Sequence, residues 1–147
     1  MKEVADNGTR AFIADVIGAG RRSVVLDVNP AFASLSAVLE EGVAGQVAMR
    51  FTASESMTQG NGVVGGGALA NMLDCGVAVA TLSSLTAGQT CSTITLTVNM
   101  LRPATAGPLF VEAKVDRVGK RIAFAQAKLF DPERRLVATA SSSLAIL

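Results

Sequence analysis

The segment from Ala68 to Leu85 constrains the fold of this chain more than any other. It contains no proline, is rich in alanine, leucine and methionine, and is apolar on nearly every side. That pattern predicts a buried helix. Its most apolar part, residues 68–82, is shorter than the roughly 20 residues of a membrane span and contains Asp74. Such a helix needs cover from other elements of the same domain.

Strand patterns lie on both sides of this helix. Two come before it, Ser36–Glu41 and Gln46–Ala53, around a turn at residues 42–45. Four come after it: Thr93–Leu101, Leu109–Val118, Ile122–Phe130 and Leu136–Ile146. Strict alternation in the first of these four predicts one face made of Thr93, Thr95, Thr97 and Asn99. We expect the four later strands to form a meander.

These patterns together predict an α+β fold, with a curved antiparallel sheet wrapped around one long buried helix and short helical segments near the N-terminus. We expect a single domain, in which residues 29–147 form the sheet and main helix and residues 1–28 form an N-terminal arm or helix. Within the arm, Thr9–Gly18 is expected to be helical, and Ser23–Val28 to be strand or helix. Asn29 and Pro30 predict the start of a further short helix. A single helix leaves the sheet edges open, which favours pairing with another subunit.

The composition excludes several classes of function. The net charge of +1 and the absence of Trp and Tyr do not favour nucleic-acid binding. Cys75 and Cys91 form no CxxC motif and are expected to be free thiols, and the first residues do not resemble a signal peptide, so we expect a cytoplasmic protein without membrane partners. The chain has no histidine, which rules out a Ser-His-Asp triad, a Cys-His pair and a His-ligated metal site. Proton transfer must therefore use a carboxylate, a lysine, a cysteine or water.

Three consecutive glycines, Gly65, Gly66 and Gly67, lie at the start of the predicted helix. A helix N-terminus offers unpaired N–H groups and the positive end of the helix dipole, and glycines let another molecule approach them closely. An oxyanion that develops on a thioester carbonyl would suit such a site. The alternative is a flexible loop that simply leads into a helix.

Asp74 is the second unusual feature, because it lies in an otherwise apolar helix where burial of a carboxylate is costly. It has a catalytic role, is held by a buried hydrogen bond, or turns to solvent beside Asn71. In a continuous helix, eight residues separate Gly66 from Asp74 by roughly 12 Å. The two cannot contact the same carbonyl unless they come from different subunits.

The sequence QGNGVVGGGALANMLD resembles the signature of PaaI-like hotdog thioesterases, in which Asn or Gln precedes His-Gly-Gly and a helix that carries Asp or Glu. Gln59, Gly66, Gly67 and Asp74 match the signature positions. The similarity extends over residues 29–147, with an opening turn and hairpin before the motif and a matching strand pattern after it. The family has the hotdog fold.

The resemblance implies hydrolysis of a small to medium acyl-CoA, aliphatic or aromatic, to free acid and CoA, in a dimer or a dimer of dimers. The Gly66 amide would polarise the carbonyl, Gln59 would orient it, and Asp74 of the partner subunit would act as general base or nucleophile, near Thr93. The residues implied in substrate binding are Gly65, Gly67, Asn61, Arg102, Lys120 and Arg121, the last three as contacts to the CoA phosphates. No metal or separate cofactor is implied, since CoA is part of the substrate.

The chain departs from the signature at Gly65, which replaces the histidine. Ala78 also lacks the hydroxyl that Glu-type relatives carry, which favours the Asp-type subgroup, where the hydroxyl comes from the Thr93 position. A hotdog dehydratase is disfavoured because those enzymes generally pair a histidine with a carboxylate. A non-catalytic acyl-CoA-binding protein stays open, as does a purely structural role. We expect an apolar acyl pocket lined by Met57, Met72 and Leu73.

Overall fold

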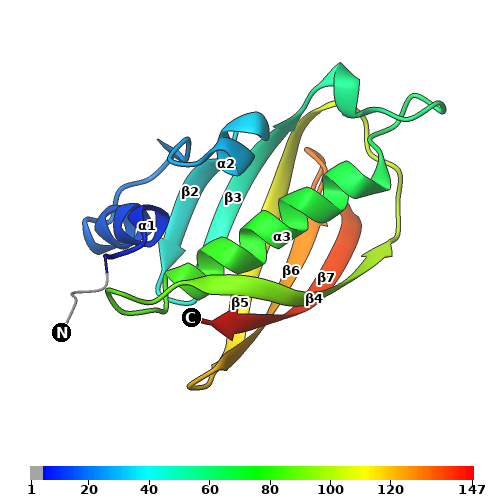
Figure 1. The fold of residues 1–147 in the computed structure, drawn as a ribbon. Coiled ribbons are helices and arrows are strands. Elements are labelled where there is room, and N and C mark those ends of the chain that lie inside the picture. The colour runs from blue at the N-terminus through cyan, green and yellow to red at the C-terminus, as the bar shows by residue number, and fades with distance from the viewer. Residues whose placement is uncertain (1–4) are drawn as a thin grey trace.

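The long helix α3, Gly66–Leu82, lies against one face of a seven-stranded antiparallel sheet (Figure 1). This arrangement comes from a computed structural model that describes residues 5–147. The strands are β1 Val24–Val25, β2 Val38–Val43, β3 Gln46–Ala53, β4 Cys91–Met100, β5 Gly107–Val118, β6 Ile122–Phe130 and β7 Leu136–Ile146. The helix contacts β3, β4, β5, β6 and β7. The predicted α+β architecture, one buried helix covered by one antiparallel sheet, is confirmed.

The strand order is β1-β2-β3-β5-β6-β7-β4, so the predicted four-strand meander is wrong. Strands β5, β6 and β7 do follow one another, but β4 pairs with β7, from Cys91 opposite Ile146 to Met100 opposite Ala138. The chain therefore leaves α3 at the far edge of the sheet and then crosses back to place β5 beside β3. Alternation along a strand reports which side chains share a face, and it does not report which strand is the neighbour.

The helix and the sheet approach closely because small residues line both. The side chains of β6 that point toward α3 include Ala123, Ala125 and Ala127, and all three are buried. On the helix, a Cβ added to Gly76 would lie 2.6 Å from Cγ1 of Val111. Glycine at position 76 is therefore a packing requirement of the core.

The N-terminal segment adds two helices, α1 Gly8–Gly18 and α2 Pro30–Ser34. Helix α1 begins one residue before its predicted start, and its buried Ile13 and Val16 belong to the core. Asn29 caps α2 as predicted, by accepting a hydrogen bond from the Phe32 N–H. The predicted strand or helix at residues 23–28 is reduced to the two residues of β1. Of the predicted polar start of the chain, residues 1–4 lie outside the described structure.

No helix within residues 5–147 has both the length and the apolar character needed to span a membrane.

Candidate functional site

The start of α3 has no side-chain cap. Gly65 is the N-cap residue, in an extended conformation, and its N–H donates to the Met57 carbonyl at 2.9 Å. Gly66 and Gly67 form the first turn, two residues earlier than the predicted helix start, and both are exposed. Their N–H groups have no acceptor within residues 5–147. Two exposed donors at the positive end of a helix dipole form a site for a developing negative charge.

The loop before the glycines is tied to the rest of the molecule. A short bridge joins Thr58 to Val64, and the Val64 N–H donates to the Ala104 carbonyl at 2.8 Å. Within the loop, Gln59 Oε1 accepts a hydrogen bond from the Asn61 N–H at 2.8 Å. Because that oxygen is occupied, the Gln59 side chain has its NH₂ group left to donate to a ligand. Gln59 and Asn61 are both exposed.

Asp74 lies half-buried in the middle of α3, and Thr93 Oγ1 donates to its Oδ1 at 2.7 Å. Its other oxygen, Oδ2, has no hydrogen-bond partner in the described part of the chain. One of the roles considered for Asp74 was a carboxylate held by a hydrogen bond. The structure shows such a bond on one of its two oxygens. The free oxygen can accept a proton from a water or a substrate.

The Asp74–Thr93 contact depends on a β-bulge that the sequence pattern did not predict. The pairing of β4 with β7 shifts register between Thr93 and Thr95. Thr95 shares a hydrogen bond with Ser143 at 2.7 Å, whereas Thr93 points to α3. The predicted common face of these two threonines is therefore wrong, because the extra residue of the bulge turns Thr93 to the other side of the sheet.

The two cysteines are free, as expected, and lie near this carboxylate. Cys75 is buried and Cys91 is half-buried. Burial, and next the negative charge of Asp74, raise the pKa of the Cys75 thiol to about 12 and that of Cys91 to about 11. Both thiols are protonated near neutral pH, so neither is a ready nucleophile. Asp74 is then the one proton acceptor that we identify near the site.

Gly66 and Asp74 do not meet within one chain. Gly66 and Asp74 lie in the same continuous helix, which separates them by roughly 12 Å. The edge next to Asp74 is β4, which is unpaired on its outer side within residues 5–147. Ile94, Met100 and Leu101 are exposed along and just beyond this strand, by 54%, 47% and 59%. An apolar, open edge of this kind is suited to pairing with another chain.

The predicted CoA contacts lie at opposite ends of the sheet. Arg102 follows the end of β4 next to Met100, whose Cε would lie 3.3 Å from a Cβ on Gly66. Lys120 and Arg121 form the turn between β5 and β6, and the Arg121 carbonyl accepts from the Ile146 N–H beside the start of β4. Along β4 these ends are separated by about 30 Å. A single chain therefore does not bring all three to one ligand.

The predicted acyl-pocket lining is partly wrong. Met72 and Leu73 are fully buried in the core, and Met57 is half-buried. Met100, which the sequence did not single out, lies close to the first turn of α3, because its Cε would be 3.3 Å from a Cβ on Gly66. Its place near the end of the predicted strand Thr93–Leu101 was the available signal.

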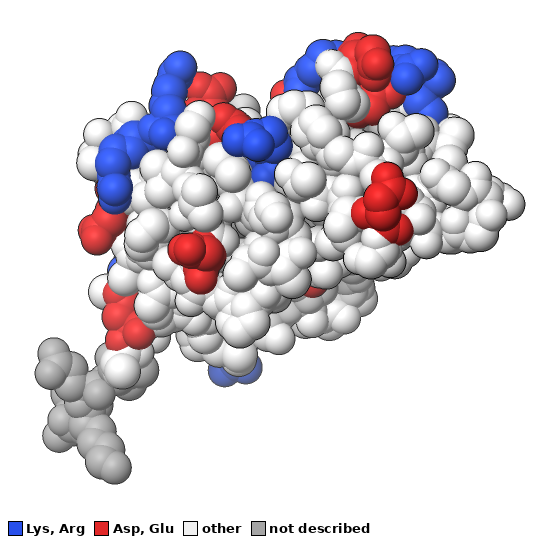
Figure 2. All heavy atoms as spheres, turned by 90° about the horizontal axis from the view of Figure 1, so that it is seen from above, with Lys and Arg blue, Asp and Glu red and all other residues white. Residues whose placement is uncertain are grey.

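Charge is distributed unevenly over the surface. In the view of Figure 2, most of the visible basic side chains lie in two groups along one side of the molecule, with a hollow between them. A groove of about 680 Å³ on the face of the sheet away from α3 is lined in part by Arg21, Arg22, Lys114 and Lys128, and by none of the predicted site residues. By contrast, α3 and β4 together contain a single charged residue, Asp74. Within residues 5–147 no cluster of three potential metal ligands occurs.

Comparisons with known proteins agree with this fold. The sequence model of the Thioesterase superfamily matches residues 61–138. A crystal structure from Ralstonia eutropha, described as a thioesterase and phenylacetic acid degradation-related protein, is 30% identical, with a TM-score of 0.77 over 90% of this chain and 98% of that one.

Two further structures show the same fold at lower identity. The PaaI protein of the E. coli phenylacetic acid degradation operon is 19% identical, with a TM-score of 0.77 over 95% of this chain and 94% of that one. A thioesterase family protein from Silicibacter pomeroyi is 22% identical, with a TM-score of 0.78 over 95% of this chain and 98% of that one. No curated protein matches the chain. With its helix wrapped by the sheet and its family match across α3 and β4–β6, the chain belongs to the thioesterase superfamily, as a PaaI-like thioester hydrolase of hotdog fold.

Proposed function

We propose that the chain hydrolyses a small to medium acyl-CoA, aliphatic or aromatic, at active sites that two subunits share. One observation carries the proposal: α3 exposes free amides at its first turn and a half-free carboxylate, Asp74, about 12 Å further along. Two such helices, antiparallel across the open β4 edge, would bring the Gly66 of one subunit to the partner subunit's Asp74. The chain would then act as a homodimer, and two homodimers would associate into a dimer of dimers.

In this arrangement the thioester carbonyl oxygen accepts a hydrogen bond from the Gly66 N–H, and the Gln59 NH₂ group helps to orient it. As general base, the partner subunit's Asp74 takes a proton from water while the water oxygen attacks the carbonyl carbon. The C–S bond breaks, and CoA leaves as a thiolate that is then protonated. Alternatively, Asp74 itself attacks, and water hydrolyses the resulting anhydride. The Thr93 hydroxyl holds Oδ1, so that Oδ2 faces the reacting atoms.

The remaining predicted contacts extend this site. Gly65, Gly67 and Asn61 would border the thioester, and Arg102, Lys120 and Arg121 would meet the CoA phosphates only after a second subunit is added. The two relatives whose descriptions mention phenylacetic acid degradation support an aromatic acyl group. Free cysteines are compatible with the reducing cytoplasm, where we place the activity. No cofactor takes part other than the CoA of the substrate.

The first experiment measures free-thiol release from a panel of aliphatic and aryl acyl-CoAs. We expect turnover by the wild type, none by Asp74→Asn, and wild-type rates for the control Asp15→Asn, which changes an exposed aspartate of α1. Equal rates for wild type and Asp74→Asn would refute the mechanism. Tight CoA binding without turnover on any substrate would instead identify an acyl-CoA-binding protein, which the glycine at position 65 keeps as the second candidate.

A second experiment tests the shared site. Gly66→Pro removes the Gly66 N–H at a helix position where proline is favoured, after a residue whose extended backbone tolerates a following proline. Gly66→Pro and Asp74→Asn should each be inactive alone. Their heterodimer retains one intact site, so random mixing of the subunits should restore about a quarter of wild-type activity. No recovery in verified heterodimers would show that the two residues serve the same subunit's site.

A further inference from the structure

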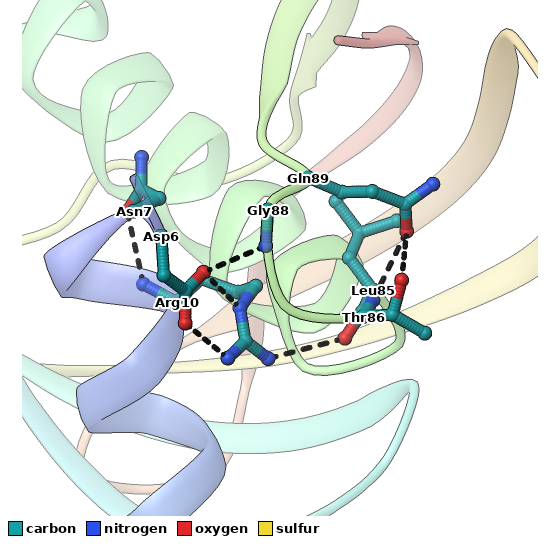
Figure 3. Close-up of polar contacts among 7 residues, drawn as sticks. All are labelled: Asp6, Asn7, Arg10, Leu85, Thr86, Gly88 and Gln89. Carbon is teal, nitrogen blue, oxygen red and sulfur yellow. Dashed lines mark hydrogen bonds and ion pairs between the residues drawn. The ribbon is translucent and has the colours of Figure 1, made fainter. Parts of the chain in front are cut away.

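The start of α1 is bonded to the connection between α3 and β4, residues 83–90 (Figure 3). The Asp6 carboxylate accepts two hydrogen bonds from Arg10, from Nε at 2.8 Å and from Nη2 at 2.6 Å. Oδ1 of Asp6 also accepts from the Gly88 N–H at 3.1 Å, and Arg10 Nη1 donates to the Leu85 carbonyl at 3.3 Å. One ion pair therefore contacts the connection at two points.

This ion pair is more than a solvated surface contact. The Arg10 side chain is only 11% exposed, and a buried cation is tolerated where its donors are satisfied. The hydrogen bond from Arg10 holds the pKa of Asp6 well below its usual range, assisted by the Gly88 N–H. A carboxyl with a lowered pKa stabilises the fold above its unfolded pKa, about 4, and loses this contribution as the pH falls further. The pair is fully ionised near neutral pH.

A second contact reaches the residue directly before the strand. Asn7 Nδ2 donates to Thr90 Oγ1 at 2.9 Å, while Asn7 Oδ1 caps α1 through the Arg10 N–H. Thr90 immediately precedes β4, and Thr93 is the third residue of that strand. Within residues 5–147 the strand has a neighbour on one side only, which is β7. The start of α1 therefore restrains the beginning of an edge strand that would otherwise be held from one side.

We propose that Arg10 and Asp6 are positioning residues for the hydrolytic site, because they fix the 83–90 connection and so keep the Thr93 hydroxyl on Asp74. The inference rests on the proposed function of Asp74. The bulge at Thr93 is a local irregularity of pairing, and a small shift of the strand start would move this hydroxyl out of reach of the carboxylate. Arg10 touches no reacting atom, and its effect passes through Thr93.

The test compares kcat and KM of Arg10→Gln with those of Arg50→Gln, using the best acyl-CoA from the panel. Arg50 is a matched control, because its Nε donates to Glu40 at 2.7 Å in an ion pair on the far side of the sheet. Arg10→Gln should lower kcat about tenfold, the effect of losing one charge-assisted hydrogen bond, and leave KM within about twofold. Arg50→Gln should leave kcat unchanged.

A double-variant cycle separates positioning from general stability. Thr93→Val should lower kcat by a similar factor, and Arg10→Gln should then produce no further loss, because both changes break the same contact. Thr90→Val removes the Asn7 contact without unpairing a buried charge, so it serves as a second variant should Arg10→Gln fold poorly, and it too should lower kcat. The inference would be overturned if the decrease in kcat of the double variant equalled the product of the two single decreases. A wild-type kcat in both Arg10→Gln and Thr90→Val would also overturn it.

The outcome for Asp74→Asn keeps the two proposals distinguishable. If Asp74→Asn is inactive while Arg10→Gln keeps the wild-type kcat, the positioning role alone is wrong. If Asp74→Asn is fully active, the catalytic role of Asp74 is wrong, and the positioning role is refuted with it.

Discussion

The starts of α1 and α3 are built in opposite ways. Asn7 caps α1, by accepting the Arg10 N–H, and the neighbouring Asp6 and Arg10 tie this end to a distant connection. Helix α3 instead has Gly65 as its N-cap residue, without a side-chain cap, and glycines at its first two positions. A side-chain cap is worth about 1 kcal/mol, and glycine is a poor helix former. The molecule thus leaves backbone donors free at the helix start that we propose as the binding site for a thioester carbonyl.

Removing one N–H from each helix start should give the largest difference in activity between the two helices. Gly66→Pro should reduce kcat about 100-fold or more, the usual cost of losing an oxyanion donor, with little change in the melting temperature. Gly8→Pro makes the same change at the first position of α1, after an equally extended N-cap residue, and should leave activity intact. Thiol release and thermal unfolding of both variants check the prediction. A large loss of activity in Gly8→Pro would contradict the claim that only the N–H at the start of α3 serves catalysis.

A second test uses the glycines further along each helix. Gly76→Ala places a Cβ 2.6 Å from the buried Val111 side chain and should destabilise the fold by about 1–3 kcal/mol. Gly18→Ala in α1 meets nothing within 4 Å and should stabilise it, by up to about 1 kcal/mol. Urea unfolding of the two variants measures the difference. Equal effects would mean that α3 can move away from the sheet to accept the methyl group.

Substitutions at the two N-cap residues should have smaller effects on stability. Asn7→Ala should destabilise the fold by about 1 kcal/mol. Gly65→Ser supplies the missing cap of α3 and should stabilise the fold by only a few tenths of a kcal/mol, since glycine is itself a tolerated N-cap. The new hydroxyl would accept an N–H from the first turns of the helix and compete with the substrate. Chemical unfolding combined with thiol release tests both, and a more active Gly65→Ser variant would contradict the assigned role of this helix start.

Local patterns predicted most of the elements. The positions of α1, α2, β3, β6 and β7 follow from periodicity, from the Asn-Pro start and from turn residues, and they differ from the expected bounds by a residue or so at most. The distance between Gly66 and Asp74 also followed from their spacing, because both lie in one continuous helix. The pairing of β4 with β7 was not predictable in this way, because it joins residues more than 35 positions apart.

Residue types and their spacing were enough to predict that one apolar helix is covered by an antiparallel sheet, and that glycine amides and one aspartate lie on that helix. Those properties are local, since they depend on residue type and on spacing within a single element. The tertiary structure adds that β4 lies at the open edge, that a bulge turns Thr93 to Asp74, and that Arg10 contacts the connection that precedes this strand. These depend on register and contact between distant segments, which are set by how the whole core packs.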